Sequence, residues 1–193
     1  EADRRAVTDD RGRYESIDLD GGRYRLYVGE NRAGMSPAWH GDRQLCPDRD
    51  DECLAVAGGT AVDGADFALD PGTPVRGSVR EADGRVVSFP ATAGAVGVEV
   101  GVWTADRQWV GHWTVGGQAV DGTPLGVCRD GSFEVHLRPG RYYLQVKDSA
   151  GVHRAEYYHP DAERDADAFD QAEPVEVGDR PVVGLGFFLA RGR

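Results

Sequence analysis

The stretch GSFEVHLRPGRYYLQV, residues 131–146, has the clearest strand pattern of the chain. Apolar and polar residues alternate before and after its Pro-Gly pair, which is typical of two strands that each have one buried face and are joined by a turn. A similar stretch, GRYESIDLDGGRYRLYV, occupies residues 12–28. The alternation in the later copy predicts a buried face made of Phe133, Val135, Leu137, Tyr142, Leu144 and Val146.

The two stretches belong to a longer internal repeat. Placing Gly22 on Gly140, a shift of 140 − 22 = 118 residues, matches the Gly-Arg-Tyr motif and the strand that follows it. An irregular acidic segment with aromatic residues comes after each copy, and then a closing strand, TAVDGADFALDPG in one copy and RPVVGLGFFLARG in the other. The repeat therefore predicts two homologous units.

The second unit, residues 73–193, is the complete one. It begins with the strand-like PVRGSVREADGRVVSF and continues into AVGVEVGVWTADRQWVGHWTV, a predicted hairpin with its turn near 105–107. With the strands described above, about seven short strands of alternating burial predict a β-sandwich. The fold class is all-β, and only residues 161–172, DAERDADAFDQA, have the character of one or two helical turns.

The first unit, residues 1–72, lacks the strands equivalent to residues 73 to about 125. A sandwich without its opening strands exposes unpaired edges and an open core. We expect these edges to be covered by a strand from another chain, by the neighbouring unit or by a preceding segment.

Composition narrows the classes of function. The chain of 193 residues is 40% hydrophobic and 28% charged, a globular balance, and its net charge is −11. This acidity argues against nucleic-acid binding, because phosphate contacts need clustered lysine or arginine. No apolar stretch approaches the roughly 18 residues that cross a bilayer, so we expect no membrane span.

Cysteine usage bears on the compartment. Cys46 and Cys53 bracket the polar loop CPDRDDEC, for which a short-range disulfide is the favoured interpretation. Such a bond would contribute about 2 to 3 kcal/mol and would place the protein outside the reducing cytosol. Reduced thiols are the alternative, and a zinc site fits the spacing poorly. Cys128 is either a small buried hydrophobe or a link to another chain.

The tryptophans of the predicted hairpin are the feature most like a binding site. Pairing Trp103 with Trp109 puts Val110 on the face of the preceding valines and puts Trp103, Trp109 and Trp113 together on the other face. Flat aromatic rings on a sheet stack on sugar rings. The alternatives are that these tryptophans pack against the first unit or contact another subunit, since a large exposed aromatic patch needs a partner.

Metal and catalytic motifs are weak. The acidic loops Asp48–Glu52 and Asp161–Asp170 have the oxygen ligands that calcium prefers, but neither has the spacing of a calcium loop. We expect solvated loops and no cofactor, with calcium as the open alternative. No nucleophile motif is present, so we expect no enzyme. The five histidines are too dispersed to predict a transition-metal site: His40, His112, His136, His153 and His159.

The second unit resembles a known family. DGSFEVHLRPGRYYLQV followed by AEYYHPDAERDADAFDQAEPVEVGDRPVVGLGFFLARG is similar to the bacterial carboxypeptidase regulatory-like repeats of secreted and cell-surface proteins. The shared motifs are an Asp-Gly-aromatic strand, an L-x-P-G-x-Y turn, an E-Y-Y segment and a closing G-x-x-F-x-L. The resemblance implies two tandem Ig-like, prealbumin-like β-sandwich units, the first lacking its N-terminal strands, and an extracellular or cell-surface location.

These observations predict a non-catalytic extracellular structural protein. It would be a spacer, an adhesive segment or a subunit of a surface assembly such as a filament, its first unit completed by a strand from a neighbouring subunit. The alternative is a carbohydrate-binding accessory module that uses the tryptophan-lined face. The expected partners are other protein subunits, a homo-oligomer included, or surface polysaccharide, and neither nucleic acid nor a membrane.

Overall fold

Strands make up nearly all the regular structure of the chain, so the fold is all-β as predicted. The computed structural model describes residues 6–16, 19–29, 34–41, 53–87, 97–118, 124–125, 131–149, 151–161, 166 and 168–192. A short 3-10 helix, η2 (Phe169–Gln171), lies in the segment expected to be helical. The strands are β1 (Gly22–Tyr24), β2 (Tyr27–Val28), β3 (Ala38–Trp39), β4 (Leu54–Val56), β5 (Thr73–Glu81), β6 (Val98–Thr104), β7 (Trp109–Gln118), β8 (Pro124–Leu125), β9 (Ser132–Leu137), β10 (Gly140–Asp148), β11 (Glu156–Tyr157), β12 (Val175–Val177) and β13 (Val182–Leu189).

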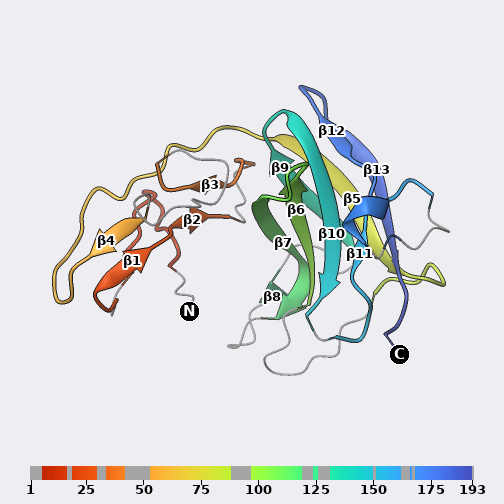
Figure 1. Cartoon of the computed structure of the whole chain (residues 1–193), viewed down its shortest axis with the longest axis horizontal. Coiled ribbons are helices and arrows are strands. Elements are labelled where there is room, and N and C mark those ends of the chain that lie inside the picture. Colours follow the sequence, from red (N-terminus) through yellow and green to blue (C-terminus); the bar gives the residue numbers. More distant parts are fainter. Residues whose placement is uncertain are drawn as a thin grey trace.

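Two sheets enclose one core in the part of the chain from β5 to β13 (Figure 1). The larger sheet has the order β11-β10-β6-β7-β8, and β12 also pairs with β10. The smaller sheet has the order β13-β5-β9, with β5 in the middle. β13 runs parallel to β5, whereas β9 runs antiparallel to it.

Alternate residues of these strands fill the core. The predicted alternation on β9 and β10 is confirmed, because all six predicted residues are at most 5% exposed. Val98, Val100 and Val102 of β6 are fully buried against them. Burial of a valine side chain stabilises a fold by about 1.5 kcal/mol or more, so this valine-rich layer is a major source of stability.

β6 and β7 form the predicted hairpin, and Arg107 in its turn has a φ of 61°. Trp103 pairs with Trp109 as predicted, and Val110 is buried at 1% exposure. The register shifts by one residue after this pair, which makes Val110 an extra residue on β7. A one-residue shift exchanges the two faces of a strand. Trp113 therefore points into the core and not, as predicted, to the face of Trp103.

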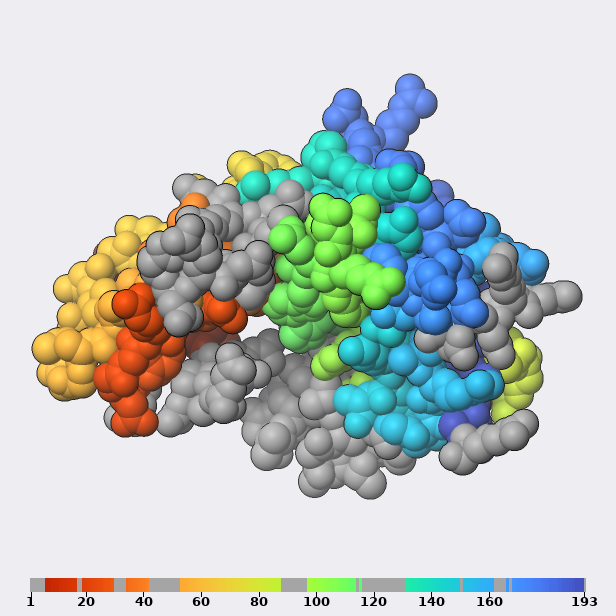
Figure 2. Space-filling model, in the orientation of Figure 1, coloured from red at the N-terminus to blue at the C-terminus, as the bar shows by residue number. Residues whose placement is uncertain are grey.

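The first unit contains two small sheets among its described residues, β1-β4 and β2-β3. It lies beside β7 and to one side of the sandwich, as the red to yellow part of Figures 1 and 2 shows. Residues 57–70, which contain the closing strand of the predicted repeat, belong to no ladder. The side chains in this stretch still alternate, with Ala65, Phe67 and Leu69 half-buried and their neighbours exposed.

Each Gly-Arg-Tyr motif makes the same turn. The Tyr24 hydroxyl donates to the carbonyl oxygen of Asp20 at 2.7 Å, and the Tyr142 hydroxyl donates to that of Arg138 at 2.9 Å. The tyrosine ring folds back over the glycine two residues before it, since a Cβ at Gly140 would lie 2.9 Å from the Tyr142 hydroxyl. The repeated motif thus encodes a turn that the tyrosine side chain closes.

Backbone contacts also recur at the spacing of the repeat. β1 pairs with β4 in the register in which β10 pairs with β12, so Gly22 lies opposite Val56 and Gly140 opposite Val177. Two hydrogen bonds recur with them: His40 N to Leu26 O (3.0 Å) matches Tyr158 N to Leu144 O (2.9 Å), and Ser36 N to Asp70 O (2.9 Å) matches Arg154 N to Ala190 O (2.9 Å). The described part of the first unit therefore has the same local geometry as the later half of the second.

The middle strand β5 depends on the absence of a side chain at Gly77. A Cβ there would lie 2.5 Å from the Phe133 ring and would also meet the carbonyl oxygen of Leu185. We expect Gly77→Ala to lower the free energy of unfolding by about 1 to 3 kcal/mol, because overpacking forces neighbouring atoms to shift. Gly178→Ala, with nothing within 4 Å of the added atom, is the control. Urea denaturation compares them, and equal stability of the two variants would contradict the packing.

Candidate functional site

The structure separates the three tryptophans predicted to form a platform. Trp103 and Trp109 are half-buried on the outer face of the larger sheet, whereas Trp113 is 6% exposed in the core. Trp103 and Trp109 also pack against different aromatic rings. A continuous three-ring surface is therefore absent, because the bulge at Val110 removes one ring from the face.

Trp109 packs against the first unit. Its ring centroid lies 5.2 Å from that of Tyr27 and 5.5 Å from that of Trp39, and those two rings are 4.8 Å apart. Tyr27 lies over Gly111 of β7, where any Cβ would meet its hydroxyl. We call Tyr27, Trp39 and Trp109 the junction cluster. Aromatic pairs at these separations contribute about 0.5 to 1.5 kcal/mol each beyond their buried area, so the cluster joins the first unit to the sandwich.

Polar contacts add less to this junction. Arg138 Nη2 lies 2.9 Å from Asp70 Oδ2, but the Asp70 side chain is 65% exposed. An ion pair in such solvent contact contributes at most about 1 kcal/mol. Among the described residues, the junction cluster therefore contributes more to this junction than the Arg138–Asp70 ion pair.

Trp103 belongs to a second group of rings on the outer face of the larger sheet. Its centroid lies 6.4 Å from Tyr157, Tyr157 lies 5.6 Å from Phe169, and Phe169 lies 4.6 Å from Tyr143. All four side chains are half-buried. We call Trp103, Tyr143, Tyr157 and Phe169 the outer aromatic row.

Two cations lie against rings of this row. Lys147 Nζ is 5.8 Å from the Trp103 ring centroid, and Arg107 Cζ is 4.7 Å from that of Phe169. Sequence reasoning found only Trp103. Tyr143 lies directly opposite Trp103 in the ladder, and the sequence alone did not predict that β10 pairs with β6. The row offers stacking surfaces flanked by positive charge.

Among its described residues, the first unit has no strand at the place that β5 occupies in the second unit. In the second unit Phe133 of β9 and Phe187 of β13 meet beneath β5, with centroids 6.0 Å apart and planes at 53°. In the first unit Tyr14 and Phe67 meet at 6.2 Å and 54°. Among the described residues, neither 13–16 nor 61–70 belongs to a β-ladder. We call the position between residues 13–16 and 63–69, which corresponds to that of β5, the acceptor position.

Two apolar side chains of the first unit are less buried than their counterparts in the second. Phe67 and Leu26 are half-buried, whereas the equivalent Phe187 and Leu144 are 0% exposed. The Tyr14 hydroxyl donates a hydrogen bond to the carbonyl oxygen of Ala65 across the acceptor position. Burial, and secondarily the carboxylate of Asp66, raises the pKa of Tyr14 above its ordinary value of 10.0. The phenol is therefore a neutral donor at physiological pH.

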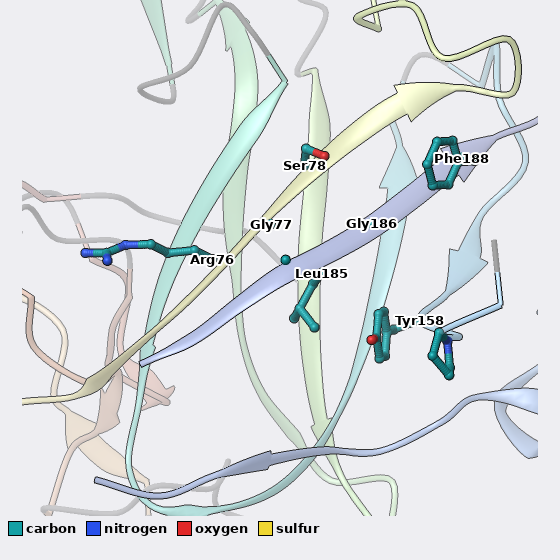
Figure 3. Close-up of a pocket in the computed structure, with 9 residues that line it drawn as sticks. Arg76, Gly77, Ser78, Tyr158, Leu185, Gly186 and Phe188 are labelled. Atoms are coloured by element: carbon teal, nitrogen blue, oxygen red, sulfur yellow. The ribbon is translucent and has the colours of Figure 1, made fainter. Parts of the chain in front are cut away.

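A pocket of about 460 Å³ lies over β13 and the neighbouring strand β5. Tyr158, Gly184, Gly186 and Phe188 line it, and Figure 3 shows Arg76 extending away from Tyr158. The Arg76 guanidinium is paired with Glu134 on β9. Burial raises the pKa of Tyr158, which leaves it protonated at neutral pH. Arg76, Ser78 and Leu185 also line the pocket, and its lining includes no carboxylate or imidazole.

A buried polar cluster lies where β5 and β10 end. His153 Nδ1 lies 2.8 Å from Asp148 Oδ2, and His153 Nε2 lies 3.5 Å from Glu81 Oε1. The side chains of His153, Asp148 and Glu81 are only 2%, 1% and 9% exposed, so a substrate cannot reach the imidazole. His153 also bridges Arg191, and the equivalent bridge of the first unit joins Met35 to Pro71. The cluster thus holds the ends of β5 and β10 together.

Several predicted sites lie partly or wholly outside the described residues. These are Cys46, Cys128, the acidic loop Asp48–Glu52 and most of 162–167 in the loop Asp161–Asp170. Cys53 is half-buried just before β4. Within the described ranges no group of three His, Cys, Asp or Glu side chains has the geometry of a metal site. No helix in the described part of the chain is long and apolar enough to cross a membrane.

The remaining histidines take separate places. His40 packs edge-on against Phe67 at 5.9 Å, and His112 lies 5.6 Å from Trp109. His136 Nε2 lies 3.1 Å from Glu134 Oε1, and the His159 ring accepts a hydrogen bond from the backbone N–H of Asp161. The structure therefore does not bring the histidines together.

No family model, curated protein or solved structure matches this chain. The functional proposals below therefore rest on its own residues and contacts.

The junction cluster gives a direct test of how the first unit is held. We expect Trp109→Ala to lower the free energy of unfolding by about 3 kcal/mol, as large aromatic truncations do. Amide hydrogen exchange should accelerate in β1 to β4 and stay slow in β9 and β10. Trp103→Ala, whose ring belongs to the outer aromatic row, is the control and should leave exchange in the first unit unchanged. Protection of β1 to β4 that survives loss of Trp109 would show that other contacts hold this unit.

Proposed function

We propose that this chain is a non-catalytic extracellular structural protein, a spacer, adhesive segment or assembly subunit built from two tandem Ig-like, prealbumin-like units, 1–72 and 73–193. The observation that supports it most is the acceptor position of the first unit. A ring pair beside this position, Tyr14 with Phe67, matches the Phe133–Phe187 pair of the sandwich, yet the strand corresponding to β5 is not among the described residues.

The energetics of this open side favour association. Phe67, Leu26 and Ala65 keep part of their apolar surface in water, whereas their counterparts are buried. Removing apolar surface from water contributes about 25 cal/mol per Å², and unpaired strand edges readily accept another strand. A partner that covers this side therefore gains both apolar burial and ladder hydrogen bonds.

Other features agree with a structural role. The His153–Asp148 pair is closed off from solvent, and the pocket beside β13 has no converging acid or base. The resemblance of the second unit to carboxypeptidase regulatory-like repeats and the spacing of Cys46 and Cys53 favour an extracellular or surface location.

Assembly in solution tests this proposal. We expect sedimentation velocity to show species larger than the monomer that increase with protein concentration. Phe67→Ser should reduce them, because it removes an apolar ring from the open side. Val183→Ser is the control, since Val183 is 65% exposed on the second unit. A monodisperse monomer whose amide exchange shows a closed, protected first unit would contradict the proposal.

The alternative function, carbohydrate binding, is favoured by the outer aromatic row. Its four half-buried rings offer stacking surfaces on one sheet face. If it binds sugars, titration with a soluble polysaccharide should change tryptophan fluorescence saturably. Trp103→Ala should abolish the change, and Val183→Ser should keep it. Absence of any change across a panel of neutral and acidic polysaccharides would rule out this alternative.

A further inference from the structure

We infer that the acceptor position binds a β-strand of a partner chain with the pattern apolar-Arg-Gly-x-apolar, the pattern of Val75 to Val79 in β5. The inference rests on the proposed function and names the kind of partner that completes the first unit. In the second unit of the same chain, β5 fills the corresponding position.

The flanking segments fix the direction of the incoming strand. In the second unit β5 runs parallel to β13 and antiparallel to β9. Residues 63–69 correspond to β13 and residues 13–16 to β9, through the matched ring pairs. Positive φ angles recur at matching glycines: Gly12 (74°) with Gly131 (77°), and Gly64 (77°) with Gly184 (84°). The incoming strand therefore runs parallel to 63–69 and antiparallel to 13–16.

Backbone groups of the first unit are oriented for this ladder. On β13 the carbonyl oxygen of Leu189 accepts from Ala82 at the end of β5, while Phe188 N–H points to the opposite edge. Leu189 and every second residue before it therefore direct their backbone N–H and C=O groups toward β5. Ala65 corresponds to Leu185, which is one of these residues, and its carbonyl oxygen accepts the hydrogen bond of the Tyr14 hydroxyl. Parallel pairing would use the same carbonyl.

The ring pair demands glycine in the incoming strand. Gly77 passes over Phe133, whose ring would lie 2.5 Å from any Cβ on that residue. Tyr14 and Phe67 reproduce the ring pair to within 0.2 Å in separation and 1° in plane angle, by the differences 6.2 − 6.0 Å and 54 − 53°. A side chain at the corresponding position would collide with the Tyr14 ring. Glycine is therefore the specificity residue of the partner.

Charge favours arginine next to that glycine. On β5 the Arg76 guanidinium pairs with Glu134, the residue after Phe133. Glu15, the residue after Tyr14, occupies the matching place, since 134 − 15 and 133 − 14 both equal 119. No ion pair of Glu15 occurs among the described residues, and its side chain is exposed. An arginine at this place of the partner strand would pair with it.

Tyr14 regulates access to the position. Its ring matches Phe133, but its additional hydroxyl projects to where the glycine of the incoming strand would pass, and it bonds Ala65 instead. The incoming strand must break this bond and displace the hydroxyl. Tyr14→Phe, which recreates the residue of the filled position, should therefore bind the strand more tightly.

The test uses the full chain and a fluorescein-labelled, C-terminally amidated peptide of residues 72–80, GTPVRGSVR. Fluorescence anisotropy should show saturable binding, and amide chemical shifts should change at 13–16 and 63–69. A Gly77→Val peptide should bind at least about tenfold more weakly, equivalent to 1.4 kcal/mol. A Tyr14→Phe chain should bind the original peptide several-fold more tightly. Tyr24→Phe, whose hydroxyl bonds Asp20 away from this position, is the matched control.

Failure of this inference is distinguishable from failure of the proposed function. Absence of binding, or equal binding of the glycine and valine peptides, would overturn the strand site even if the chain assembles. Chemical-shift changes confined to the pocket residues of β13, such as Gly186 and Phe188, would overturn it too, because the peptide would then be bound in that pocket. Specific peptide binding by a chain that remains monomeric would support the strand site and contradict self-assembly.

Discussion

The rest of this structure depends on one strand position, that of β5 between β9 and β13. β5 completes the smaller sheet, covers the Phe133–Phe187 pair and leaves room for both rings through Gly77. Where this strand is present, side chains such as Leu144 and Phe187 are fully removed from water. Where the described residues contain no equivalent strand, the same motif produces two-stranded sheets and half-buried side chains. A shared local sequence pattern therefore gives a closed core in one place and an open one in another.

Local and long-range interactions separate clearly in the first unit. The tyrosine-closed turn at Tyr24 needs only nearby residues, whereas the register of β1 with β4 and the ring pair of Tyr14 with Phe67 join distant segments of the first unit. Burial of the core needs a second layer, which these residues alone do not supply. The junction cluster supplies part of this burial, because Tyr27 and Trp39 pack against Trp109 on the outer face of β7. The first unit thus forms these contacts from its own residues, and the junction cluster holds it against β7.

Sequence alone predicted the all-β class, the buried alternation of β9 and β10, and the pairing of Trp103 with Trp109, since each follows from residue periodicity or turn residues. It misplaced Trp113, because a bulge inserts a single residue and no composition signal marks it. It also missed the outer aromatic row, whose members come from three separate elements and η2. Contacts of this kind depend on strand order, which periodicity does not contain.

The bridges that close the two units differ in chemistry. In the second unit the bridge of His153 with Arg191 lies beside the buried carboxylates of Glu81 and Asp148, whereas the first unit joins Met35 to Pro71 at the matching place. Segments of similar sequence in one chain are prone to exchange strands while they fold. If β5 folded into the first unit, Glu81 would lose its histidine and would face an apolar bridge, and a buried charge without a partner costs several kcal/mol. A buried carboxylate therefore fits beside His153 but not beside the Met35–Pro71 bridge.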